Sequence, residues 1–87
     1  MWDWDGQKRQ ATLLIRGLDF AMVEAMDLDL AEISRDTRQD YGEARFQARG
    51  LIGERLFVIV FTRRGDKLRL ISLRKANKRE QVLWENR

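Results

Sequence analysis

The chain has 87 residues, of which 44% are hydrophobic and 36% are charged. That length predicts a single domain spanning residues 1–87, and the composition is too apolar for a disordered chain and too charged for a membrane span. Cysteine and histidine are absent, which excludes disulfides, thiolate metal sites, histidine triads and His-Glu-x-x-His zinc proteases. The opening segment is charged and lacks an apolar run, so we expect no signal peptide or membrane anchor and a cytoplasmic location.

The net charge of +3 conceals an uneven distribution along the chain. Residues 1–43 contain 5 Lys and Arg against 10 Asp and Glu, whereas residues 44–87 contain 12 against 4. Positive charge concentrated in one half of a small domain predicts a basic face and an anionic partner such as nucleic acid. A solvated surface without a specific partner is the alternative interpretation.

Two helices are predicted in the N-terminal half. Each begins at an aspartate that can accept hydrogen bonds from the first turn, Asp5 or Asp19, and Gly17 is placed to end the first helix. Apolar residues recur at helical spacing in both: Ala11, Leu14 and Ile15 in the first helix, and Phe20, Val23 and Met26 in the second.

Strands are predicted from residue 28 onwards. Residues 28–35 are a weak strand candidate, residues 36–43 form a polar loop, and the alternation from Arg45 to Gly50 is typical of a strand with one wet face. Leu56–Phe61 is apolar on both faces, as in a central strand. Gly65-Asp66 predicts a hairpin turn leading into a strand over Lys67–Lys75.

A helix is predicted at the C-terminus, where Asn77 and Glu80 have the spacing of a capping box. The complete prediction is an α+β fold with two N-terminal helices, an antiparallel sheet of three to four strands and a C-terminal helix.

Basic side chains crowd the last hairpin and its exit. The cluster contains Arg63, Arg64, Arg69, Arg74 and Lys75, and it extends to Lys78 and Arg79 on the last helix. Arginine binds phosphate oxygens in pairs, so this cluster suits a phosphodiester backbone. Regular alternation puts Arg69 and Lys75 on one face of the strand and Arg74 on the other, whereas a bulge or strand exit near Leu73 would bring all three together.

RNA hydrolysis at such a site needs stabilisation of the phosphorane and two proton transfers. Arginine and lysine supply fixed positive charge for the first task. Histidine is absent, so the proton must be transferred by another side chain. The candidates are a lysine of lowered pKa, the Tyr41 hydroxyl or one of the carboxylates of Glu80, Glu43 and Asp40. A basic docking face without chemistry is the alternative. The carboxylates of residues 36–43 have no recognised ligand spacing, so we expect no metal and no cofactor.

Three runs of residues resemble the BrnT toxin family. They are D-T-R-Q-D-Y-G-E-A-R-F from Asp36, V-x-V-F-T-x-R-G-D from Val58 and L-R-L-I-S-L-R-K-A-N-K-R-E from Leu68. The resemblance implies a small RelE-like α+β toxin that cleaves RNA without a metal and arrests translation. It also implies a ribbon-helix-helix antitoxin similar to BrnA, held with the toxin in a hetero-oligomer.

The resemblance implies specific roles in RNA cleavage, with matching positions at Arg64, Arg69, Arg74, Lys75 and Glu80. In this hypothesis Arg69 and Arg74 stabilise the phosphorane, Lys75 and Arg64 position the RNA, and Glu80 accepts the proton. Arg63, Lys78 and Arg79 add RNA contacts.

The chain departs from the family pattern at two places. The usual Lys-His before the glycine is Ile15-Arg16, and the usual C-terminal tyrosine is Trp84, which either stacks on a base or packs on the sheet. A scaffold that binds RNA and antitoxin with weak or no cleavage is therefore the alternative function.

Overall fold

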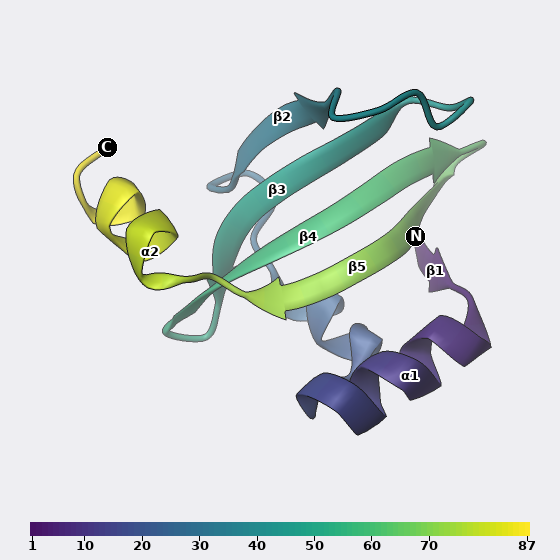
Figure 1. Ribbon diagram of the computed structural model, residues 1–87, viewed down its shortest axis with the longest axis horizontal. Coiled ribbons are helices and arrows are strands. Elements are labelled where there is room, and N and C mark those ends of the chain that lie inside the picture. Colours follow the sequence, from purple (N-terminus) through teal and green to yellow (C-terminus); the bar gives the residue numbers. More distant parts are fainter.

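The computed structural model describes residues 1–87 as a five-stranded sheet with helices around it (Figure 1). The strand order is β1-β5-β4-β3-β2. β1 pairs with β5 in parallel, and the other neighbours are antiparallel. In chain order the elements are β1 (Trp2–Trp4), α1 (Gly6–Arg16), the 3₁₀ helix η1 (Phe20–Ala25), β2 (Glu32–Asp36), β3 (Arg45–Ile52), β4 (Arg55–Arg64), β5 (Lys67–Lys75) and α2 (Lys78–Glu85).

The predicted α+β arrangement of two N-terminal helices and an antiparallel sheet of three to four strands was wrong. The sheet has five strands and is mixed, because Trp2–Trp4 forms β1 beside the free edge of β5. Three residues are too few to show a period-2 pattern in the sequence. The backbone N–H of Leu68 donates to the carbonyl of Met1 at 2.7 Å, so it is the free edge of β5 that orders this segment.

The predicted second α-helix is instead the six-residue 3₁₀ helix η1. Asp19 caps it by accepting a hydrogen bond from the backbone N–H of Ala21. A 3₁₀ helix has three residues per turn, so positions i and i+3 point in the same direction. Phe20 and Val23 have this spacing and are both fully buried. Met26, the C-cap residue six positions after Phe20, is buried as well. Residues six apart point in different directions on an α-helix but in the same direction on a 3₁₀ helix, so this burial pattern favours the tighter helix.

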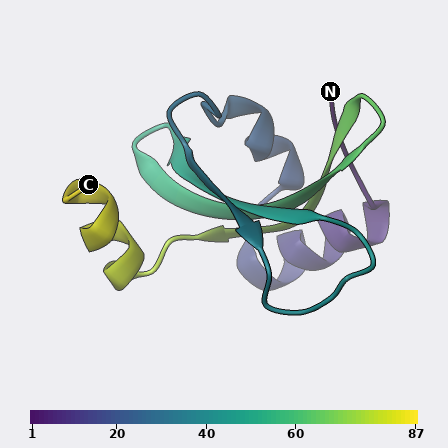
Figure 2. The same ribbon diagram turned by 90° about the horizontal axis from the view of Figure 1, so that it is seen from above.

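The apolar core lies on both faces of the central strand β4. η1 covers one face (Figure 2), where Phe20 and Val23 pack with Phe57, Ile59 and Phe61 of β4. The alternate residues of β4 belong to a smaller cluster at the α2 end of the sheet, which contains Leu56, Val58, Ala76 and Trp84. The central position predicted for Leu56–Phe61 is confirmed, and the second face beyond the small cluster is left open for polar side chains.

Candidate nucleic-acid interface

A bulge in β5 decides which basic residues share a face. Arg74 lies opposite Val58 and Arg69 lies opposite Thr62, but the register shifts between Val60 and Phe61, which leaves Ile71 without a partner on β4. Because Val58 and Thr62 are four residues apart on a regular strand, Arg69 and Arg74 lie on the same face. Lys75 lies opposite Phe57 and so belongs to the other face. Neither arrangement considered from the sequence is the one observed.

Two arginines of β3 complete this open face. Arg45 lies opposite Thr62 and Arg49 lies opposite Val58, so the four arginines occupy the corners of a rectangle around Val60. We call Arg45, Arg49, Arg69 and Arg74 the arginine platform. Arginines in one row are separated by two strand spacings, roughly 10 Å, and the two rows are roughly 13 Å apart along the strands. Four cations at this spacing can contact successive phosphates of one strand of nucleic acid.

The platform arginines are held by carboxylates of the same chain. Their side chains are only 25% to 36% exposed, because the sheet covers their aliphatic stems. Three of the ion pairs are long: 3.5 Å from Arg45 to Glu43, 3.6 Å from Arg49 to Glu32 and 3.5 Å from Arg69 to Asp3. Pairs of this length are looser than a charge-assisted hydrogen bond of about 2.8 Å. These three guanidinium groups are therefore available to an incoming phosphate.

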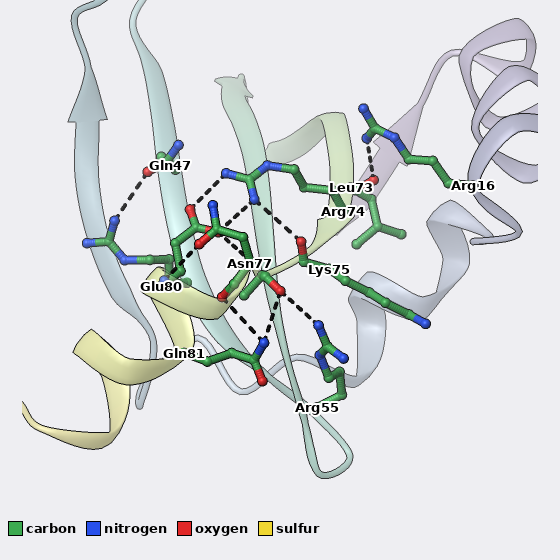
Figure 3. A network of polar contacts seen from close by, with 11 residues as sticks. Arg16, Gln47, Arg55, Leu73, Arg74, Lys75, Asn77, Glu80 and Gln81 are labelled. Carbon is green, nitrogen blue, oxygen red and sulfur yellow. Dashed lines mark hydrogen bonds and ion pairs between the residues drawn. The ribbon is translucent and has the colours of Figure 1, made fainter.

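Arg74 is the exception, because Glu80 binds it tightly. Its Nη1 and Nη2 donate to the two carboxylate oxygens of Glu80 at 2.8 and 2.9 Å (Figure 3). Glu80 also accepts from the backbone N–H of Asn77, whose side chain accepts from the backbone N–H of Glu80 in return. This is the capping box predicted for α2. The start of α2 thus fixes the direction in which Arg74 points.

These contacts change the acidity of Glu80. Hydrogen bonds from Arg74 and from the backbone N–H of Asn77 lower the pKa of Glu80 from 4.5 to about 2, against the opposing effect of burial. A carboxylate with so low a pKa is a weak proton acceptor. The geometry supports a positioning role for Glu80.

Replacing Glu80 tests this pair through the stability of the fold. Because the pKa of Glu80 is lowered on folding, its carboxylate stabilises the protein above pH 4.5, and this contribution is lost as the pH falls from 4.5 towards 2. We expect Glu80→Gln to lower the free energy of unfolding at neutral pH, and we expect its difference from wild type to shrink through that window. Urea unfolding at a series of pH values measures it.

The matched control for that experiment is Glu85→Gln at the exposed C-terminal end of the same helix. This variant should follow the wild-type curve at every pH. A Glu80→Gln variant whose difference from wild type is the same at low and neutral pH would contradict the assignment.

The loop between β2 and β3 orders one end of the platform. The carboxylate of Asp36 has 2% of its surface exposed and accepts from the Arg38 guanidinium at 2.8 and 2.7 Å. These hydrogen bonds are the main reason why the pKa of Asp36 is held well below its ordinary value. The Tyr41 hydroxyl donates to the same carboxylate at 3.2 Å, and the Arg45 guanidinium lies 4.2 Å from the centre of the Tyr41 ring. Tyr41 is therefore an anchor that orients Arg45.

The family of the chain follows from a comparison of its sequence with models of known protein families. Residues 4–80 match the model described as "Ribonuclease toxin, BrnT, of type II toxin-antitoxin system". The chain belongs to the BrnT family. Its family is thus one of ribonuclease toxins, for which RNA is the substrate and an antitoxin is the partner. No curated protein sequence matches the chain.

The residues that match the BrnT model include all four platform arginines. The basic residues that the sequence predicted for the site lie on both faces of the sheet. Arg69, Arg74 and Glu80 come together on the open face, and Arg64 lies at its end, 3.5 Å from Glu43. Two predicted residues lie on the face that η1 covers, namely Lys75 opposite Phe57 and Arg63 opposite Leu68. Lys78 and Arg79 are exposed in the first turn of α2.

The site candidates chosen from the sequence left out three polar residues of the open face, namely Arg45, Gln47 and Arg49. Their period-2 spacing predicts the wet face of a strand, and that spacing is the signal that could have identified them. Trp84 belongs to the apolar cluster at α2 and has Arg87 stacked 3.5 Å from its ring centre. It therefore packs on the sheet. Neither α1 nor α2 combines the length and the apolar composition that crossing a membrane requires.

Proposed function

We propose that this BrnT-family chain cleaves RNA on the arginine platform without a metal ion and thereby arrests translation. The observation that carries the proposal is the placement of Arg69 and Arg74 on one open face with Arg45 and Arg49. Fixed cations can stabilise the phosphorane in the way that a metal ion would. Each carboxylate that borders the platform lies within 3.6 Å of a platform arginine. These contacts support a role for the carboxylates in orienting the guanidinium groups.

The reaction is an attack by the ribose 2′-oxygen on the adjacent phosphorus. The 2′-hydroxyl loses its proton, the new P–O2′ bond forms, the P–O5′ bond breaks and the 5′-oxygen takes up a proton. The products are a 2′,3′-cyclic phosphate, which hydrolyses to a 3′-phosphate, and a 5′-hydroxyl. In our proposal Arg69 and Arg74 stabilise the charge on phosphorus, while Arg45, Arg49 and Arg64 hold the backbone.

Proton transfer in this proposal involves a carboxylate at the border of the platform. Glu80 is bound at 2.8 Å by Arg74 and has a pKa of about 2, so it positions Arg74. Glu43 is 3.5 Å from both Arg45 and Arg64. Its looser contacts make Glu43 the better proton acceptor of the two.

The remaining parts of the proposal concern the partner and the cellular setting. Residues 1–87 act as one domain in the cytoplasm, in a hetero-oligomer with a ribbon-helix-helix antitoxin similar to BrnA. Membership of a type II toxin family supports the antitoxin, and the resemblance of the C-terminal runs supports its type. Sequencing the gene beside this one tests the pairing, because a short reading frame with a ribbon-helix-helix pattern is expected there.

Cleavage of total RNA by the purified toxin in EDTA tests the proposed chemistry. We expect cleavage with EDTA to equal cleavage with Mg²⁺, and we expect every new 5′ end to be a hydroxyl, which polynucleotide kinase labels without prior phosphatase treatment. A requirement for Mg²⁺, or new 5′-phosphate ends, would show that the proposed reaction is wrong.

A second candidate function is a non-catalytic module that binds RNA and antitoxin. The tight Arg74–Glu80 pair favours it, since an arginine held by its own carboxylate has fewer hydrogen bonds to give to a phosphorane. This candidate predicts salt-sensitive RNA binding without turnover, because phosphate contacts release counterions. The cleavage experiment in EDTA distinguishes the two functions.

A further inference from the structure

The apolar stripe of α1 does not face the core. No residue of α1 is buried, and Leu14 and Ile15 have 83% and 81% of their surfaces exposed. Ala11, which precedes Leu14 by three residues, is exposed as well. Large exposed apolar side chains gathered on one helix face are typical of an interaction surface.

Polar contacts hold α1 in place while its stripe stays open. Arg16 Nη1 donates to the backbone carbonyl oxygen of Leu73 at 2.8 Å (Figure 3). At the other end Arg9 pairs with Asp19 at 2.8 Å, and Asp5 caps the first turn. α1 therefore keeps its position beside β5 without burying Leu14 or Ile15.

A groove separates α1 from β5 and is continuous with the arginine platform. It encloses about 300 Å³, and its wall on the β5 side is formed by Ile71 and Ser72. Ile71 is the extra residue of the bulge, which leaves its side chain half-exposed beside Ile15 and Ala11 of the helix. Ser72 lies opposite Val60, in the row between the two arginine pairs. Any segment seated in the groove therefore lies against the platform.

The charge of the groove defines the kind of segment that fits it. Lys8 and Arg16 stand at its two ends, eight residues or about 12 Å apart on the helix, and Ala11 and Ile15 lie between them. α1 contains no acidic residue. A segment with apolar side chains in its middle and carboxylates at both ends complements this pattern.

We propose that this groove is the docking site of the antitoxin, which occupies it with an acidic amphipathic segment. The proposal rests on the function proposed above, since the family supplies the antitoxin and the platform supplies the activity to be neutralised. A segment that covers Ile15, Ile71 and Ser72 excludes RNA from the β5 side of the platform. Its carboxylates also compete with phosphate for the platform arginines.

The test measures the affinity of the purified toxin for the antitoxin encoded beside it. Ile15→Glu places a carboxylate in the apolar middle of the groove, and we expect it to weaken binding about 100-fold, as for the loss of a central anchor. Lys8→Glu reverses one charged end and should weaken binding about tenfold. The matched control is Leu83→Glu on α2, where a leucine that is 64% exposed lies outside the groove. The affinity of this variant should stay within about twofold of wild type.

Cleavage of RNA by each isolated variant is measured beside the binding. Because Ile15 is exposed and lies outside the platform, Ile15→Glu should fold, as judged by circular dichroism, and should cut RNA at the wild-type rate while resisting neutralisation. Arg69→Ala should lose cleavage. If wild type does not cleave RNA, or if Arg69→Ala cleaves it as fast as wild type, the proposed function is wrong, whatever the antitoxin affinities are. Wild-type antitoxin affinity of Ile15→Glu would overturn the docking site. Two other results would also overturn it. If Ile15→Glu no longer cleaves RNA, the groove binds RNA. If Ile15→Glu without antitoxin has a different oligomeric state from wild type, the groove binds a second copy of the chain.

Discussion

Replacing Arg69 or Arg74 by alanine should lower the rate of RNA cleavage by the isolated toxin about 100- to 1000-fold, the usual cost of losing one group that stabilises a developing oxyanion. The two arginines share the open face because the register shift in β5 leaves Ile71 unpaired. Single-turnover cleavage of a short RNA measures the effect.

Lys75→Ala is the matched control for this prediction. Lys75 follows Arg74 directly but lies on the opposite face of the sheet, so we expect its rate to stay within about twofold of wild type. A large effect of Lys75→Ala together with a small effect of Arg69→Ala would contradict the platform.

Arg74→Ala also releases Glu80 from its ion pair, and this effect on α2 must be separated from the effect on catalysis. Arg74→Lys keeps a positive charge but cannot form the two parallel hydrogen bonds seen at 2.8 and 2.9 Å. We expect it to recover part of the stability and little of the cleavage. The ion pair of Arg69 with Asp3 is longer, at 3.5 Å, so Arg69→Ala should cost less stability than Arg74→Ala.

The second large effect is expected at Phe20. This side chain is fully buried and packs edge-on against Trp4, with ring centres 6.5 Å apart. Phe20→Ala should reduce the free energy of unfolding by about 3–5 kcal/mol, a large share of the roughly 5–15 kcal/mol typical of a whole domain. Chemical denaturation followed by circular dichroism measures it.

Leu30→Ala is the control for Phe20→Ala, because Leu30 is 68% exposed between η1 and β2. We expect its stability to stay within about 0.5 kcal/mol of wild type. If Phe20→Ala costs no more than Leu30→Ala, then η1 does not close the core as the structure shows.

The site was only partly predictable, and β5 shows why. Leu70 and Leu73 are three residues apart, yet both are buried in the cluster beneath η1. A regular strand would put them on opposite faces, so their common burial requires an extra residue, and Ile71 is that residue. The same shift moves Arg74 onto the face of Arg69 and moves Lys75 to the opposite face. Local alternation could not show this, because the packing of η1 from the other half of the chain causes it.

The sequence by itself determined the family and the features that depend on residues within about four positions of one another. The capping box of Asn77 and Glu80, the caps of α1 at Asp5 and Gly17, and the hairpin turn at Gly65 are of this kind, because each is closed by neighbouring side chains and backbone groups. Tertiary structure alone decided that Trp2–Trp4 joins the sheet, that η1 is a 3₁₀ helix and that the stripe of α1 stays exposed. These features depend on which distant surfaces bury one another, and burial is a property of the whole fold.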